Sequence, residues 1–476
     1  MKEKMKNKIS PTKILVIGML ILILVGAIIL KLPISNKKGK SINFIDAFFT
    51  STSAVCVTGL VTKIPAEQFS GFGQFVIMCL IQIGGLGFMT FVSMLLMFIG
   101  KKIKLSDRII IKESLNQDTF SGMVELIKRI CKYTFIFELT GALLLGIRFI
   151  PEYGTKRGIF YSIFHSISAF CNAGFDIIGT NNFAKYSSDV LVNFTLMALI
   201  IIGGLGFTVW SDIFKSITKG IKEKIKPKRI WKEFSLHTKI VLTMTIILLL
   251  TGTLFIYLFE HKNITVMAND SFGVKILKSA FQATTLRTAG FSTVEQAELT
   301  TAGKFISICY MFVGGSPAGT SGGIKTTTLA VLILCIISFI LGKNEITVFK
   351  KTIPFEIVKR AMVIFSISIF IVIIAIMGLL ISEISLQEEM YISQIAAFRT
   401  FTFMDIFYEA VSAFGTVGLS LNVTSGLTTI GKIIVAMLMI IGRLGPITIS
   451  IALFKRNNKE KNENVAVYPK GNIIVG

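Results

Sequence analysis

The sequence predicts an all-α integral membrane protein with eight transmembrane helices plus four re-entrant half-helices, organised as four pseudo-symmetric repeats around one axis. Three observations carry this prediction. The chain is 52% hydrophobic and only 16% charged, so it has too little polar surface for a soluble protein of 476 residues. Several apolar runs approach the roughly 20 residues that cross a bilayer. Four segments of similar sequence recur along the chain.

The clearest spanning candidates are apolar runs with few charged residues, at 13–30, 191–202, 241–259, 363–381 and 433–441 with its flanks. The first of them also resembles a signal peptide, because the basic segment 1–13 precedes it. However, the apolar stretch is longer than a typical signal core, and no small-residue cleavage site follows it. We therefore expect a spanning helix here.

The formal net charge of +23 would suggest nucleic acid as the partner of a soluble protein. Here 32 of the 50 Lys and Arg residues gather in alternate segments, at 1–13, 101–132, 215–239, 343–360 and 455–470. This asymmetry follows the positive-inside rule, so both termini and the three internal basic loops are expected in the cytoplasm. Charge therefore predicts contact with the lipid bilayer and not with nucleic acid. Whether the basic face also docks an acidic partner stays open.

Each repeated segment is a short stretch rich in Ser, Thr and Ala, followed by a small residue, a glycine and a Leu or Phe. Such a stretch is too short to span and fits a re-entrant half-helix. Long apolar runs flank it, and the glycines are Gly59, Gly174, Gly290 and Gly418. The predicted units are repeat 1 (1–100), repeat 2 (101–220), repeat 3 (221–345), repeat 4 (346–456) and a cytoplasmic tail (457–476).

A second signature of small residues follows each loop glycine, at 83–87, 202–206, 313–317 and 441–445. Small residues let membrane helices approach closely, so any single copy is explained by packing alone. Four copies in register with the four glycines favour a common architecture.

Irregular backbone at membrane depth is tolerated where it lines a cavity, and four such loops around one axis would bring their carbonyls together. Carbonyl rings replace the hydration shell of potassium. Glycine reaches positive φ there, and the negative ends of the half-helix dipoles favour a cation. The repeats are thus helix–pore loop–helix units around one pore. The predicted filter residues are Val57, Thr58, Gly59, Asn172, Ala173, Gly174, Thr288, Ala289, Gly290, Thr416, Val417 and Gly418.

Asp46 and Asp405 occupy matching places at the starts of the first and fourth half-helices. We expect them to cap these helices or to complement their dipoles. Direct attraction of the ion is the alternative.

The apolar stretch 303–342 would be about 60 Å long as a helix, twice the membrane core. Five glycines and a proline between 314 and 323 predict a break. We interpret this break as a gate beneath the ion site. Its residues are Gly314, Gly315, Ser316, Pro317, Ala318, Gly319, Thr320, Ser321, Gly322 and Gly323, with Lys325 and Arg443. The segment 319–326 resembles a phosphate-binding P-loop, but Ile324 separates Gly323 from Lys325, so ATP binding is not expected.

Arg443 replaces a small residue of the second signature inside an apolar helix. An ionisable residue at membrane depth is a functional hypothesis, and fourfold pseudo-symmetry places Arg443 below the filter as a barrier to cations. The alternative is an arginine bound to carbonyls for structure alone. Lys325 is expected to snorkel from the loop or to pair locally.

The four loops, the segment 314–328 and Arg443 together resemble the Trk/Ktr/HKT superfamily of potassium transporters over essentially the whole chain. Within it, eight helices without an extra N-terminal pair are similar to the KtrB-type membrane subunit. The resemblance implies that the four glycines are filter glycines, that 314–328 blocks the pore, and that Arg443 lies beneath the filter. It also implies a bacterial cell membrane protein, a homodimer with one pore per subunit, a cytosolic KtrA-type ring that binds nucleotide, and uptake of potassium stimulated by sodium.

The alternative functions fall into three classes. A Trk-type symporter coupled to protons or sodium is the alternative within transport. A membrane enzyme would need clustered His, Asp, Glu or Cys, but the three histidines form no zinc motif and the six cysteines no CxxC pair. A non-transporting scaffold or sensor would leave the four filter-like loops without a purpose.

Overall fold

The computed structural model describes residues 11–37, 41–87, 90–94, 123–179, 183–224, 226–384, 401–446 and 448–449. Within them, each repeat begins with a long apolar helix, and these four helices are long and apolar enough to cross a membrane unaided. They are α1 (Pro11–Lys31), α7 (Met123–Tyr153), α12 (Leu236–Glu260) and α16 (Phe355–Leu379). The predicted tail 457–476 lies outside the described residues.

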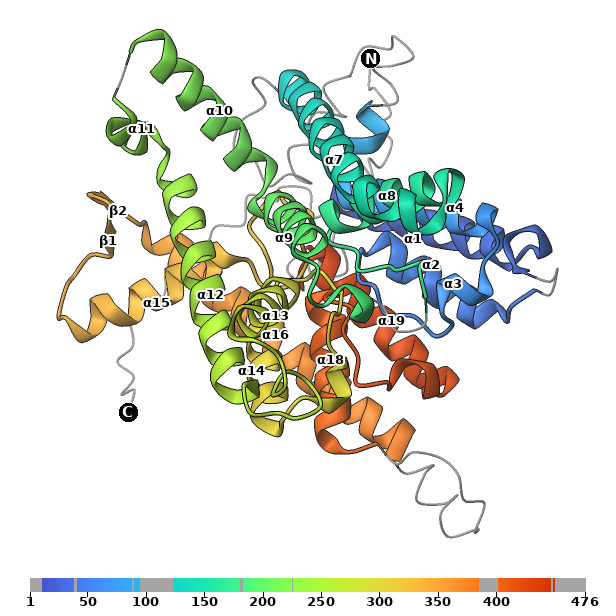
Figure 1. Ribbon diagram of the computed structural model, residues 1–476. Coiled ribbons are helices and arrows are strands. Elements are labelled where there is room, and N and C mark those ends of the chain that lie inside the picture. The colour runs from blue at the N-terminus through green and yellow to red at the C-terminus, as the bar shows by residue number, and fades with distance from the viewer. Residues whose placement is uncertain are drawn as a thin grey trace, which may run out of the picture.

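A half-helix packs against the long helix that precedes it in every repeat. These half-helices are α2 (Phe44–Val55), α8 (Thr155–Phe170), α13 (Phe272–Thr285) and α18 (Phe403–Gly415). Their C-terminal halves are buried in the centre of the protein. The four units lie around a common centre in Figure 1, from blue through green and yellow to red. This arrangement confirms the all-α fold class.

The second helix of each repeat begins at a residue whose side chain accepts a backbone N–H, as helix N-termini require. The capping residues are Ser70, Asp189, Thr300 and Thr428. The helices are α4 (Gly71–Leu86), α9 (Val190–Leu205) with α10 (Phe207–Lys222), α14 (Thr301–Met311) with α15 (Thr326–Ile340), and α19 (Thr429–Leu444).

These second helices also break in repeats 1, 2 and 4, for which no break is predicted from the sequence. The axes of α9 and α10 differ by 95°, and Gly206 at the break has φ +93°. Gly87 and Gly445, which end α4 and α19, have φ +83° and +86°. Only glycine takes such angles readily, so the last glycine of the second signature terminates the helix. In repeat 3 the predicted break is present between Met311 and Thr326.

The remaining described elements are short. They comprise α3 (Pro65–Gln68), α11 (Pro227–Glu233), the antiparallel pair β1 (Thr347–Val348) and β2 (Lys351–Thr352), the π-turn Leu380–Ile384, and the single 3₁₀ turns Pro33–Ser35, Ala184–Tyr186, Gln296–Glu298 and Thr424–Gly426. A buried glutamate ties the long helix to the second helix in repeats 3 and 4. Glu260 and Glu383 each accept hydrogen bonds from the N–H and hydroxyl of the capping threonine, at 2.6 to 3.1 Å.

Candidate ion pathway

The four loops share one backbone conformation, and this conformation is energetically unfavourable for the non-glycine residues that adopt it. In each, the first residue of the predicted filter tripeptide and its glycine both have positive φ. The values are +56° for Val57, +59° for Asn172, +64° for Thr288 and +52° for Thr416, and +97°, +65°, +80° and +92° for Gly59, Gly174, Gly290 and Gly418. A left-handed non-glycine residue costs about 1–2 kcal/mol. Strain of this kind persists only where the surroundings impose it, and it gathers at functional sites.

The loops form a closed ring, because each glycine lies against a carbonyl of the next repeat. A Cβ added to Gly59 would lie 2.6 Å from the carbonyl oxygen of Ala173, and one on Gly174 would lie 2.6 Å from that of Ala289. The series continues from Gly290 to the Val417 carbonyl at 2.5 Å, and from Gly418 back to the Thr58 carbonyl. The residues before the four glycines thus place their carbonyls side by side around one centre.

Hydroxyl groups of the half-helices hold this ring. Ser53 accepts the Thr58 N–H through its carbonyl (2.8 Å) and the Gly59 N–H through its hydroxyl (3.0 Å). Ser412 does the same in repeat 4, where its hydroxyl accepts the Gly418 N–H at 3.2 Å. In repeats 2 and 3, hydroxyls donate instead to the carbonyls that follow the glycines, from Ser168 to Phe175 and from Thr285 to Phe291. These bonds explain the Ser- and Thr-rich composition of the repeat.

The glycines of the second signature pack the second helices against the half-helices. A Cβ on Gly84, Gly203 or Gly442 would overlap the carbonyl of the last half-helix residue or its neighbour in the same repeat. Packing therefore accounts for the first glycine of the signature, and helix termination for the last.

The break in the third repeat lies directly against the ring. A Cβ on Gly322 would overlap the Thr416 side chain, and one on Gly314 would lie 3.3 Å from the Thr288 methyl group. The carboxamide of Asn172 lies 2.9 Å from the Ser321 hydroxyl. Three of the four left-handed residues of the ring thus touch the segment 314–323, which we call the blocking loop.

The blocking loop has an ordered backbone. Its two ends meet in a parallel bridge, where the Gly314 N–H donates to the Ile324 carbonyl at 2.8 Å, and the Thr326 N–H donates to the Gly315 carbonyl at 3.0 Å. The Ser316 and Thr326 hydroxyls are 2.9 Å apart. The glycines allow the chain to turn back at this depth, and the bridge fixes where α15 begins.

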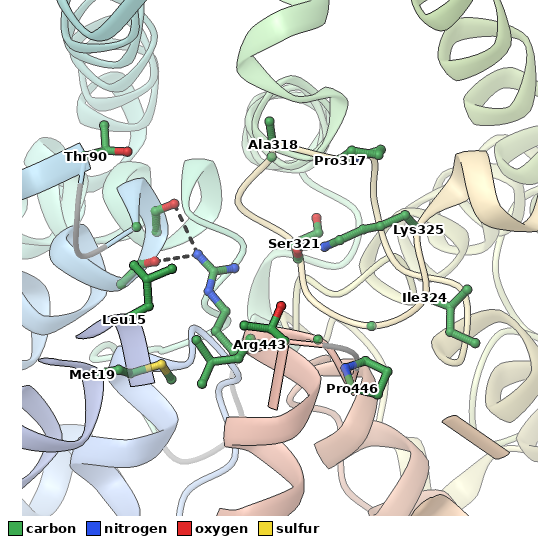
Figure 2. Close-up of a pocket in the computed structure, with 18 of the residues that line it drawn as sticks. Leu15, Met19, Thr90, Pro317, Ala318, Ser321, Ile324, Lys325, Arg443 and Pro446 are labelled. Carbon is green, nitrogen blue, oxygen red and sulfur yellow. Dashed lines mark hydrogen bonds between the residues drawn. The ribbon is translucent and has the colours of Figure 1, made fainter. Parts of the chain in front are cut away.

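A cavity of about 290 Å³ lies on the other side of the blocking loop, beside the start of α1. Lys325, Arg360 and Arg443 line it, and no acidic residue of the described part of the chain does. Figure 2 shows Arg443 extended towards the end of α4, with Ser321 and Lys325 across the cavity. A cation in this space would lie near the charges of Lys325 and Arg443, which disfavours its presence there.

Arg443 connects the blocking loop to repeat 1. Its guanidinium donates to the carbonyls of Thr320, Gly84 and Gly85. Lys325 donates to the Ser321 carbonyl at 2.6 Å, which is the local pairing that the sequence predicted. Arg443 therefore lies where the predicted barrier to cations would be, and it also makes the carbonyl contacts of a purely structural arginine. The functional roles of Arg443 and Lys325 stay predictions.

Asp405 and Asp46 differ although their places match. Asp405 completes a capping box with Thr402, as expected. The Asp46 side chain instead forms an ion pair with Lys432 of α19, 2.8 Å away, and makes no cap. Asp46 therefore does not cap α2, but it lies in the first turn of this helix, where its carboxylate complements the helix dipole, which is the other expected role.

Sequence reasoning missed several buried polar groups around the ring. His165 pairs with Asp176 at 2.8 Å, and Glu409 accepts hydrogen bonds from Ser420 and Thr424. In the half-helices, His165 and Glu409 both stand nine positions before the loop glycine, and Asp176 and Ser420 two positions after it. Alignment of the four repeats on their glycines was the signal that would have found them.

Comparisons with known proteins agree with this geometry. The model of the TrkH family, described as cation transport protein, matches residues 4–465. A potassium/sodium uptake protein, NtpJ, of Enterococcus hirae is 38% identical over 100% of this chain and 99% of its own length. The Ktr system potassium uptake protein B of Bacillus subtilis is 39% identical over 98% of this chain and 97% of its own.

A solved structure shares the fold. The crystal structure of the potassium transporter TrkH from Vibrio parahaemolyticus superposes with a TM-score of 0.68 at 19% identity, over 95% of this chain and 86% of that one. Together with the relatives that match over the full length, it confirms the resemblance to the Trk/Ktr/HKT superfamily and to its KtrB-type subunits. The matched proteins are ion transporters and not enzymes. The chain is therefore a membrane transporter that belongs to the TrkH family of cation transport proteins.

Proposed function

We propose that this protein takes up potassium across a bacterial cell membrane through a channel-like, gated pore. The observation that carries the proposal is the closed ring of four loops, in which each glycine packs against a carbonyl of the next repeat. Carbonyls placed in this way replace the water around a potassium ion. The ends of four half-helices converge there, and their dipoles favour a cation.

The blocking loop and Arg443 are proposed as the gate. The loop lies against the ring on one side and lines the positively charged cavity on the other. An ion leaving the ring would have to displace the loop and then pass Lys325 and Arg443. Opening must therefore move the loop, the arginine or both.

We further propose that sodium stimulates transport and that the subunit forms a homodimer under the control of a cytosolic KtrA-type ring with bound nucleotide. The name of the Enterococcus relative includes sodium, and the names of the Bacillus relatives place them in a Ktr system with more than one component. Both termini are proposed to be cytoplasmic, in line with the distribution of basic residues.

The test is flux through the purified protein in liposomes. Rubidium uptake is measured with potassium, sodium and lithium as competitors, first with the protein alone and then with an added KtrA-type ring. We expect potassium to compete best, and the ring with nucleotide to change the rate. Protein that is folded and carries no rubidium under either condition would refute the proposal.

A matched pair of variants assigns the pathway in the same assay. Gly290→Ser adds a Cβ that meets the Val417 carbonyl in the ring, whereas Gly273→Ser adds one that meets nothing within 4 Å. Flux or ion preference should change in the first variant only. Equal behaviour of both folded variants would exclude the ring as the site of selection.

A further inference from the structure

The blocking loop forms most of its main-chain hydrogen bonds to other repeats with repeat 2. The Ser316 N–H donates to the Gly204 carbonyl at 2.9 Å, and the Thr320 N–H to the Gly203 carbonyl at 3.2 Å. In return, the N–H of Phe207, at the start of α10, donates to the Ala318 carbonyl at 2.9 Å. All three partners lie at the break between α9 and α10, in repeat 2.

Asn172, the repeat-2 residue of the ring, adds a side-chain link between the ring and the blocking loop. Its carboxamide lies 2.9 Å from the Ser321 hydroxyl and 3.2 Å from the Thr320 hydroxyl. The side chain is 1% exposed, so water does not compete for these bonds. The next residue is Ala173, whose carbonyl lies against Gly59 in the ring.

The equivalent residues of the other repeats do not make this link. Val57 has no polar side-chain group. The hydroxyls of Thr288 and Thr416 are buried and have no hydrogen-bond partner among the described residues. Asn172 is thus the one residue of the four that joins the ring to the blocking loop through a side-chain hydrogen bond.

We propose that Asn172 is a positioning residue that couples ion occupancy of the ring to the position of the blocking loop. The proposal rests on the proposed function, because it assigns a further role within the same pore. Asn172 has only two side-chain torsions and a left-handed backbone, so the ring and the loop are joined through a short, stiff connection.

Ion binding and loop position are thermodynamically linked in this arrangement. An ion that draws the Ala173 carbonyl inward moves the adjacent Asn172 backbone, and hydrogen bonds weaken steeply when their geometry changes. The loop therefore responds to the ion through the Asn172 carboxamide. By reciprocity, the position of the loop changes the affinity of the ring for the ion by the same factor.

Thr320 extends the connection to the other side of the pore. Its hydroxyl faces Asn172, while its carbonyl accepts a hydrogen bond from Arg443. Asn172 and Arg443 thus hold the same loop residue from repeats 2 and 4. Release at either end is expected to loosen the loop.

Asn172→Gly is the sharpest variant, because glycine keeps the left-handed backbone and removes only the carboxamide. Asn422→Gly is the matched control: Asn422 has φ +63° and an exposed side chain that hydrogen-bonds Glu295, away from the loop. The readout is amide hydrogen exchange of peptides that cover 312–328, in potassium and in choline, with the full-length protein in nanodiscs.

We expect exchange in 312–328 to differ between potassium and choline in the wild-type protein and in Asn422→Gly. In Asn172→Gly this difference should be lost, and exchange should rise roughly fivefold to 150-fold, as expected for the loss of two neutral hydrogen bonds. Exchange in the half-helices should stay as in the wild type. A wild-type loop that ignores potassium, or an Asn172→Gly loop that still responds to it, would overturn the proposal.

Ser321→Ala removes the same bond from the loop side and serves if Asn172→Gly does not fold. It should reduce the response to potassium, and the double variant should add little to Asn172→Gly. Additive effects of the two substitutions would also overturn the coupling. Rubidium flux measured on the same samples keeps the two questions apart. If the wild-type protein carries rubidium but exchange in its loop does not depend on potassium, only the role of Asn172 is refuted. If the folded wild-type protein carries no rubidium, the proposed function is refuted.

Discussion

Gly59→Ala tests the ring most directly, because both the backbone and the space at this position exclude a side chain. The new Cβ would lie 2.6 Å from the Ala173 carbonyl oxygen, about 0.8 Å short of the 3.4 Å at which ordinary contact begins. The carbonyl must retreat by a similar distance, which removes one of the four carbonyls proposed to bind the ion. A hydrogen bond or ligand contact to a charged group contributes about 1.5–3 kcal/mol, so the half-saturating potassium concentration should rise roughly 10- to 100-fold.

Gly154→Ala is the control that separates strain from position. Gly154 also has positive φ, at +77°, but nothing lies within 4 Å of an added Cβ. Both substitutions carry a positive-φ backbone cost of about 1–3 kcal/mol, so both should lower the unfolding temperature in detergent.

The assay is concentration-dependent rubidium uptake into liposomes, with thermal unfolding measured on the same preparations. We expect Gly154→Ala to have the half-saturating concentration of the wild type and Gly59→Ala to have a higher one. A folded Gly59→Ala protein with unchanged half-saturation would show that the Ala173 carbonyl does not contact the ion.

Three further predictions follow from single contacts. Arg443→Gln should raise rubidium flux severalfold, because it frees the blocking loop and removes a charge from the cavity; lower flux in folded protein would contradict the gate. Asp46→Asn should cost about 3–5 kcal/mol of unfolding free energy by leaving Lys432 unpaired, and Asp46→Asn with Lys432→Met should recover most of it in thermal unfolding; no recovery would show that the pair is not the cause. Ser53→Ala leaves the buried Gly59 N–H without its hydroxyl acceptor, so it should destabilise the protein by about 1–3 kcal/mol and weaken potassium uptake; wild-type uptake would argue against a ring held by this bond.

Sequence predicted the repeats, the half-helices and the broken helix because each depends on residues that are neighbours along the chain. Apolar runs set helix length, and glycine with proline sets the break at 314–323. The helix ends at Gly87, Gly206 and Gly445 carried the same kind of local signal, a glycine directly after an apolar helix. The same signature also contains glycines that pack closely, so the sequence alone does not separate a packing glycine from one that ends a helix.

The partners of individual side chains could not be predicted in this way. Asp46 and Lys432 are 386 positions apart, and Asn172 and Ser321 are 149 apart. Nothing in either neighbourhood specifies the other, because the contact exists only once four repeats have closed around a centre. Pseudo-symmetry gives the order of the repeats, but not which of four similar positions binds the loop.

Among the described residues, only repeat 3 inserts a loop beneath the ring, and this asymmetry depends on how the pore is encoded. In an assembly of identical chains, any insertion beneath the ring would appear once per subunit, and the copies would collide on the axis. A pore encoded as one continuous chain escapes this constraint, since each quarter can change without the others. Repeat 3 can then carry the loop, repeat 2 can form hydrogen bonds with its backbone, and repeat 4 can supply the arginine that contacts it. Equivalent positions can therefore take different roles in a single polypeptide, whereas in a homotetramer they must stay identical.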